Sequence, residues 1–233
     1  MSHLWRILRM VVAVCALGAV FATAAQASTE YFVCVKATVK GTGKYSDAEC
    51  ATETSTGGKY ERQSAIGTTY KGKSGPVTTT IPATGATITC AKSKSESEVT
   101  GASEASFSIT LEKCSSGGVT CQSEGTKAGI IELKGVESSL SNGYTLKEVH
   151  TMPKTNLSAF RCGKLSLVAT GGFDSTEASE VHGKAVKAFS IAFEGPQEDF
   201  AIEASEEGVP LGTFPAEVGM TASYKAKKPL GVS

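Results

Sequence analysis

Six cysteines are the residues whose type and number most plainly predict chemistry in this chain. The sequence contains seven cysteines, and the first of them, Cys15, lies in an N-terminal leader. The remaining six form an even set, which in an exported chain predicts disulfide bonds rather than free thiols. They are Cys34, Cys50, Cys90, Cys114, Cys121 and Cys162.

The pairing of these cysteines is open, because six thiols allow about 15 connectivities. The scheme that we expect is Cys34–Cys50, Cys114–Cys121 and Cys90–Cys162. The first two pairs each close a Gly/Ser-rich loop between neighbours in sequence, and the third would tie two distant strand-like segments. Metal ligation is the alternative, but the sequence has no C-x-x-C and no histidines at zinc-site spacing from the thiols.

Titratable groups suited to catalysis are few after the leader. Two small sets exist: His182 with Asp174, Glu177 and Glu180, and Glu148 with His150, which would share one face of a strand. A solvated loop or strand edge is the alternative for both sets. There is no G-x-S-x-G motif, no calcium-binding loop and no Gly-rich phosphate loop, so we expect no metal and no cofactor.

A hydrolase with two carboxylates stays open as an alternative, since glutamates are plentiful and the two need not be close in sequence. The composition argues against a sugar substrate. The single tryptophan, Trp5, lies in the leader, so the aromatic platforms usual in sugar sites would have to come from Tyr and Phe.

Residues 1–27 have the order of a secretory signal peptide. His3, Arg6 and Arg9 give a basic start, residues 10–23 are almost entirely apolar, and 25–27 is an A-x-A cleavage triplet. The apolar run is shorter than the ~20 residues of a membrane span. We therefore expect cleavage, secretion and no membrane span in the mature chain, with a retained anchor as the alternative.

The charge of the mature chain predicts no nucleic-acid partner. Removing Arg6 and Arg9 leaves 21 Lys and Arg (23 − 2) against 23 Asp and Glu, a net charge of −2. Nucleic-acid binding needs a strongly basic patch or domain. We expect instead an extracellular or cell-wall partner.

Short β-type segments separated by Gly/Ser/Thr turns recur along the mature chain. Among them are residues 77–81, 129–133, 165–170 and 218–224, and Asn142-Gly143 is a strong hairpin signal. No long segment has a helical period. The pattern predicts an all-β protein, an antiparallel sandwich or barrel. We expect a small disulfide-closed N-terminal β module at 28–75 and a main β domain at 76–233.

Three polar stretches are interpreted as irregular. Residues 52–58 read as a loop, and residues 92–98, with alternating Lys, Ser and Glu, read as a solvated turn. Residues 224–228 carry three lysines and read as a solvated C-terminal tail. The alternative for this last stretch is contact with an anionic wall polymer.

Two units of the chain resemble a group of secreted proteins of soil actinobacteria whose function is not established. The first unit contains Cys34, 40–45 and Cys50, followed by 58–61; the second contains 88–90, Gly101, Cys114, Cys121 and 129–130, with Cys162 later. The resemblance implies export and a shared β framework, and it implies no activity. The glycine expected shortly before Val99 is Ser or Glu here.

The function predicted from the sequence is therefore that of a secreted, non-catalytic, disulfide-stabilised β protein with a structural or binding role outside the cell or at its surface. Two alternatives stay open. One is the secreted hydrolase with a carboxylate site, and the other is a protein inhibitor that presents the loop between Cys114 and Cys121.

Overall fold

The computed structural model describes residues 29–140, 149–152, 156–172, 174–175, 177–178 and 181–233, and these residues form strands, turns and coil without a helix. The all-β prediction is confirmed. Among the described residues no helix is long and apolar enough to cross a membrane. The expected signal peptide and the Asn142-Gly143 turn lie outside the described residues.

Nineteen strands occur in the described part of the chain. They are β1 (Tyr31–Lys36), β2 (Gly43–Tyr45), β3 (Glu53–Gly58), β4 (Tyr60–Ser64), β5 (Thr69–Ser74), β6 (Val77–Ile81), β7 (Ala86–Cys90), β8 (Lys92–Val99), β9 (Glu104–Glu112), β10 (Ser115–Ser116), β11 (Val119–Ser123), β12 (Ile130–Leu140), β13 (Val149–Met152), β14 (Ser158–Cys162), β15 (Leu165–Thr170), β16 (Glu177–Ala178), β17 (Val186–Phe193), β18 (Pro196–Glu206) and β19 (Val209–Val232). The strands expected at 77–81 and 165–170 coincide with β6 and β15.

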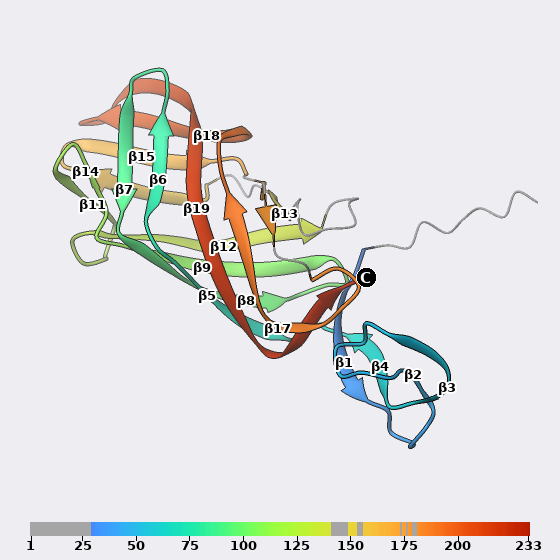
Figure 1. The fold of residues 1–233 in the computed structure, drawn as a ribbon. Helices are drawn as coiled ribbons and strands as arrows, with labels where there is room; N and C mark the ends of the chain where they lie inside the picture. Colours follow the sequence, from blue (N-terminus) through green and yellow to red (C-terminus); the bar gives the residue numbers. More distant parts are fainter. Residues whose placement is uncertain (1–28, 141–148, 153–155, 173, 176, 179–180) are drawn as a thin grey trace, which may run out of the picture.

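Eight antiparallel strands close into a barrel (Figure 1). Each strand pairs with the next in the order β6, β7, β10, β11, β14, β15, β18 and β19, and β19 pairs back with β6. The antiparallel order places four hairpin turns at one end of this barrel. These turns are residues 82–85, 117–118, 163–164 and 207–208.

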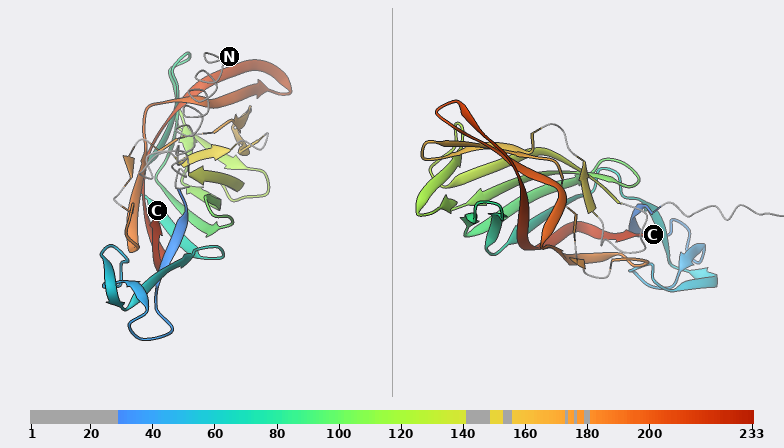
Figure 2. Two further views of the ribbon diagram at one scale, coloured as in Figure 1. Left: turned by 90° about the vertical axis from the view of Figure 1, so that its right-hand side faces the viewer. Right: turned by 90° about the horizontal axis from the view of Figure 1, so that it is seen from above.

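A second sheet continues from the barrel and is also antiparallel. Its strand order is β13, β12, β9, β8, β5, β19, β17 and β16. The chain passes directly from β5 to β6, from β7 to β8 and from β9 to β10, so these strands bend out of one sheet into the other. Strand β19 runs from the barrel to the N-terminal strands and belongs to both sheets (Figures 1 and 2).

Alternation of side chains across the sheets builds the core between them. Strand β8 shows this most clearly, because its charged residues are exposed whereas Ser93, Ser95, Ser97 and Val99 are buried. The interpretation of residues 92–98 as a solvated turn is therefore wrong. The strict period of two, with small serines facing inward, is that of a half-buried strand.

Residues 52–58 were also interpreted wrongly as a loop. Residues Glu53–Gly58 form β3, which pairs with β2 at the outer edge of the N-terminal strands. The strand is polar because most of its side chains are exposed, and an edge strand needs no apolar face.

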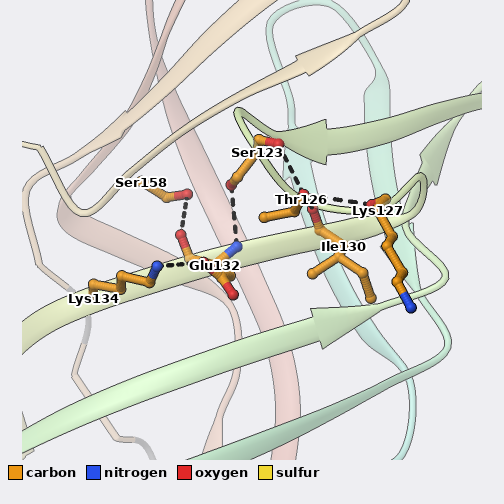
Figure 3. A network of polar contacts seen from close by, with 7 residues as sticks. All are labelled: Ser123, Thr126, Lys127, Ile130, Glu132, Lys134 and Ser158. Carbon is orange, nitrogen blue, oxygen red and sulfur yellow. Dashed lines mark hydrogen bonds and ion pairs between the residues drawn. The ribbon is translucent and has the colours of Figure 1, made fainter.

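A polar network holds the chain where β11 leaves the barrel and β12 begins (Figure 3). The Ser158 hydroxyl donates to the Glu132 carbonyl at 2.8 Å, and the Glu132 amide donates to the Ser123 hydroxyl at 3.1 Å. The Thr126 hydroxyl lies 2.8 Å from the Ser123 carbonyl and 2.9 Å from the Ile130 carbonyl. The network gives hydrogen-bond partners to two buried serines, Ser123 and Ser158, and so avoids the cost of burying an unpaired hydroxyl.

Three disulfides form, and only one of them is the pair expected from sequence. Cys34 bonds to Cys50, as predicted. The pairs Cys90–Cys162 and Cys114–Cys121 are wrong. The observed bonds are Cys90–Cys114 and Cys121–Cys162.

The registers explain the correction, because the four cysteines form one row across β7, β10, β11 and β14. Cys121 lies directly opposite Cys162, and Cys90 lies one position beyond the Thr89–Ser115 pair, opposite Cys114. Cys114 and Cys121, the two inner cysteines of the row, also lie opposite each other, and the Cys121 amide donates to the Cys114 carbonyl. In an antiparallel sheet, such a hydrogen-bonded pair has the more widely spaced Cα atoms. The bridged pairs have Cα atoms 4.0 and 4.1 Å apart.

Strands β1–β4 form a small sheet at the N-terminal end, closed by the Cys34–Cys50 bond (Figure 1). Arg62 joins it to the rest of the chain. Its Nη2 donates to the carbonyls of Cys50 at 2.9 Å and of Gly183 at 2.5 Å, and its guanidinium lies 4.1 Å from the centre of the Phe32 ring. The boundary at residue 75 stays a prediction; β5, which precedes it, pairs with β8 and β19.

Candidate functional site

An open groove lined by lysines lies on the outer face of the second sheet, over β5, β19 and β17. Its volume is about 790 Å³. We call it the lysine groove. It is defined by four lysines and three small residues beside them, namely Lys71, Lys73, Lys225 and Lys227 with Ala188, Ser190 and Ser223.

Strand register places the four lysines on one face. Lys71 and Lys73 are two residues apart on β5, and Lys225 and Lys227 are two residues apart on β19, so each pair points the same way. Lys71 lies directly opposite Lys225 across the β5–β19 ladder. The groove is therefore cationic along both of these strands.

Acidic residues are absent from the strands that form the groove. Strands β5 and β17 and residues 218–232 of β19 contain lysines but no Asp or Glu. The nearest compensation comes from β8, where Glu96 lies 2.5 Å from the Lys71 ammonium group. The Lys71 ammonium holds the pKa of the Glu96 carboxyl below its ordinary value.

Lys94, on the neighbouring strand β8, already has a carboxylate partner. Its ammonium lies 2.5 Å from Glu112, which Lys92 also contacts at 3.0 Å. These two lysines lower the pKa of the Glu112 carboxyl. In contrast, Lys73, Lys225 and Lys227 make no ion pair within the described residues.

Buried aromatic rings support the groove from below. Tyr70, Phe189 and Tyr224 alternate with its outward residues on β5, β17 and β19, and the Phe189 and Tyr224 rings stack at 5.2 Å. Tyr70 meets Tyr224 edge-on at 5.7 Å. Burial raises the pKa of Tyr224 to about 12 and that of Tyr70 well above its ordinary value, so both hydroxyls stay neutral.

Glycine at position 72 is required by this packing. Gly72 lies between Lys71 and Lys73 and directly opposite Tyr224. A Cβ atom at this position would lie 2.5 Å from the Tyr224 ring, which is far inside van der Waals contact. The absence of a side chain lets the Tyr224 ring and the Ser95 hydroxyl pack directly against β5.

Comparisons of the chain with protein-family models, with curated proteins and with solved structures found no match. The site therefore has to be judged from its own chemistry.

The interpretation of residues 224–228 as a solvated tail is wrong. These residues lie in β19, paired with β5 on one side and with β17 on the other through Tyr224 and Lys225. Alternation buries Tyr224 and exposes Lys225 and Lys227. The basic stretch at 224–228 is visible in the sequence, but its closeness to Lys71 and Lys73 depends on the β5–β19 pairing, which no local pattern indicates.

The two titratable sets expected from sequence do not become a site in the described residues. Asp174 is exposed, and its amide donates to the Gln197 side chain at 2.7 Å, whereas His182 forms a backbone bridge with Val232. The side chains of Glu177 and His150, and the whole of Glu148 and Glu180, lie outside the description. Among described residues no three of His, Cys, Asp and Glu gather as metal ligands would.

A small apolar cavity of about 70 Å³ lies where the barrel strands meet β9 and β12 of the second sheet. Its wall is almost entirely aliphatic and aromatic, with Thr79 and Ser158 as the polar exceptions, and includes no Asp, Glu or His. The residues that line the lysine groove also include no Asp, Glu or His. Neither hollow therefore offers the carboxylate pair that a glycosidase-type mechanism needs.

Asp47, one of the few aspartates, has a structural environment. Its carboxylate accepts hydrogen bonds from the amides of Ala51 at 3.1 Å, Thr52 at 2.7 Å and Glu49 at 2.9 Å. These backbone donors, Ala51 first, lower the pKa of the Asp47 carboxyl. The aspartate thus shapes the loop around Cys50 and is fully engaged by backbone amides.

Proposed function

We propose that this chain is a secreted, non-catalytic protein that works in the extracellular space or at the cell surface, where it binds an anionic partner through the lysine groove. The signal-peptide pattern at 1–27 supports export, and the three disulfides support location in an oxidising compartment. The disulfides cross-link the barrel and the N-terminal strands, and the second sheet, which carries the groove, continues from the barrel over packed aromatic rings.

The observation that carries the proposal is the cluster of Lys71, Lys73, Lys225 and Lys227 on a chain whose mature charge is −2. A cationic patch on a mildly acidic protein concentrates positive potential at one place, and this is the condition for steering an anionic partner to it. An inhibitor role for the loop between Cys114 and Cys121 loses its basis, because these cysteines are not bonded to each other.

Expression of the full chain in a secreting bacterial host tests the proposal. We expect the mature protein outside the cytoplasm, beginning at Ser28 by N-terminal sequencing, with no free thiol by mass analysis. We also expect part of it to be retained on the cell envelope and released by salt, since screening weakens exposed charge contacts.

A triple variant, Lys73→Gln, Lys225→Gln and Lys227→Gln, should lose this retention. A control with the same change of charge, Lys40→Gln, Lys44→Gln and Lys59→Gln, alters exposed lysines in and between the N-terminal strands and should keep it. Mature protein that stays in the cytoplasm with reduced cysteines would refute the proposed location, and equal retention of both variants would refute the role of the groove.

A further inference from the structure

We infer that the lysine groove binds a linear anionic polymer, one whose phosphate or carboxylate groups repeat along an extended chain. The inference rests on the proposed function, because it names the class of partner for the same surface.

Like charges face each other in this sheet at two positions. Lys71 lies opposite Lys225, and Lys73 lies opposite Lys94. Directly opposed like charges disfavour strand pairing. Glu96 and Glu112 compensate one member of each pair, Lys71 and Lys94, and the other members, Lys225 and Lys73, have no carboxylate partner among the described residues. A bound anion would compensate these two charges, so the surface is complementary to negative charge.

The lattice of a β-sheet sets the spacing of these ammonium groups. Residues two apart on one strand are separated by about 7 Å, and opposed residues on neighbouring strands by about 5 Å between Cβ atoms. The flexible lysine side chains add several ångströms of reach. A polymer with one charge every few bonds can therefore contact three or four lysines at once, whereas a single small anion contacts one or two.

Small side chains form the floor of the groove beside the lysines. Ala188 and Ser190 on β17 and Ser223 on β19 line it, and the hydroxyl oxygens of Ser190 and Ser223 are 3.4 Å apart. Side chains of this size leave room for a polymer backbone to lie along the sheet. Their hydroxyl groups also offer hydrogen bonds to phosphate or carboxylate oxygens.

Buried aromatic rings distinguish this surface from a single-stranded nucleic-acid site. Such sites expose aromatic rings on which bases stack, in addition to positive charge. In this protein the rings of Tyr70, Phe189 and Tyr224 face the core and are 3%, 6% and 3% exposed. The groove offers ammonium and hydroxyl groups without an exposed aromatic ring face on which a base could stack, which suits a polymer without planar bases.

Every cation in the groove is a lysine. A lysine ammonium is a point charge without the fixed two-pronged geometry of arginine, so it accepts anions in many orientations. This favours a repetitive polymer over a single shaped ligand. It also predicts binding that weakens steeply with salt, with a log–log slope of about −2 for three contacts.

Binding of the purified mature protein to two defined polymers tests the inference. Poly(glycerol phosphate) carries phosphate groups and polygalacturonate carries carboxylates, and fluorescence anisotropy of the labelled polymers over a salt series separates the two sources. We expect at least one polymer to bind with the stated salt slope. The Lys73/Lys225/Lys227→Gln variant should bind at least about tenfold more weakly.

Two further variants sharpen the result. The Lys40/Lys44/Lys59→Gln control should bind like the parent protein. Glu96→Gln should bind about twofold more tightly, because it removes the one carboxylate that pairs with Lys71 among the described residues. Melting temperatures of all variants show whether each is folded.

Three outcomes would overturn the inference: no binding of either polymer at low salt, equal loss in the triple variant and its control, or equally tight binding of single-stranded DNA of matched charge. If neither polymer binds in vitro but the groove lysines are still needed for retention on cells, the polymer class is wrong and the proposed function stands. If retention and export both fail, the proposed function is wrong.

Discussion

The barrel and the second sheet are stabilised by different means. In the barrel, β10 contributes a two-residue ladder on each side, and two disulfides cross β7, β10, β11 and β14 in this place. In the second sheet, β8 and β9 pair along the whole length of Lys92–Val99, and none of the three disulfides crosses this ladder. Its core contains the interlocked rings of Tyr70, Phe107, Phe189 and Tyr224.

This difference shows where covalent bonds are needed. A two-residue ladder gives few hydrogen bonds and little packing to offset the entropy of ordering its strands, so disulfides supply the missing constraint. A long ladder above an aromatic cluster holds without them. The lysine groove lies on the second region, where packing alone fixes the outer face.

The largest expected effect comes from removing a barrel disulfide. Replacing Cys121 and Cys162 by serine releases a link with a sequence separation of 41, and should lower the free energy of unfolding by about 4 kcal/mol in the chain-entropy account. Urea denaturation measures the loss. Hydrogen exchange should show faster opening of β10, β11 and β14 than of β8 and β9.

Equal acceleration of hydrogen exchange in both regions would contradict the conclusion that disulfides stabilise the barrel strands more than the second sheet. Peptide mapping without reduction supplies the control, since a Cys90 peptide linked to Cys114 is expected in both the parent and this variant.

The second largest loss of stability is expected where the Tyr224 ring packs against β5 in the second sheet. Gly72→Ala places a Cβ atom 2.5 Å from the Tyr224 ring, and should cost about 2–3 kcal/mol because the ring has to move. Gly75→Ala is the matched control, since nothing lies within 4 Å of its added carbon. Thermal unfolding of the pair measures the difference, and equal melting temperatures would show that the ring yields freely.

A smaller effect is expected at the junction between the N-terminal strands and the rest. Arg62→Met keeps the apolar stem but removes the hydrogen bonds to the Cys50 and Gly183 carbonyls and the contact of the charge with Phe32. The loss should be about 1–2 kcal/mol. Limited proteolysis measures it, with cleavage expected first near residue 183. Unchanged resistance to protease would remove Arg62 from its role at this junction.

The smallest effect is the pH dependence of Asp47. Its carboxyl pKa is lowered in the folded protein, so its contribution to stability is present above the unfolded pKa of about 3.9 and is lost as pH falls through the lower folded value. Asp47→Asn should therefore be less stable than the parent at neutral pH, by no more than about 1 kcal/mol. The gap should close in acid. Denaturation at both pH values checks this, and a gap that widens in acid has the wrong sign.

Much of the fold was predictable from local pattern. Residues 77–81 and 165–170 were recognised as strands because their composition and flanking turns are local properties. Strand β8 was missed because its inward residues are serines, which do not look like a core without the aromatic rings that cover them. The cysteines were identified correctly, but their partners depend on strand register, which the sequence does not state.

Only part of the candidate site was predictable from the sequence. The lysines at 225, 227 and 228 form a recognisable basic stretch, whereas Lys71 and Lys73 form no such stretch. The two pairs come together only through the β5–β19 ladder, which joins segments about 150 residues apart. Contacts of such long range are set by the whole core and not by any local signal.

The sequence by itself determined that the chain is all-β, that its cysteines cross-link, and that it begins with the pattern of an exported protein, since these depend on residue type, parity and short-range alternation. Tertiary structure alone decided that eight strands close into a ring, that Cys90 reaches Cys114 rather than Cys162, and that four lysines meet on one face. The physical reason is that register fixes which side chains share a face, and register is chosen by the packing of the entire molecule.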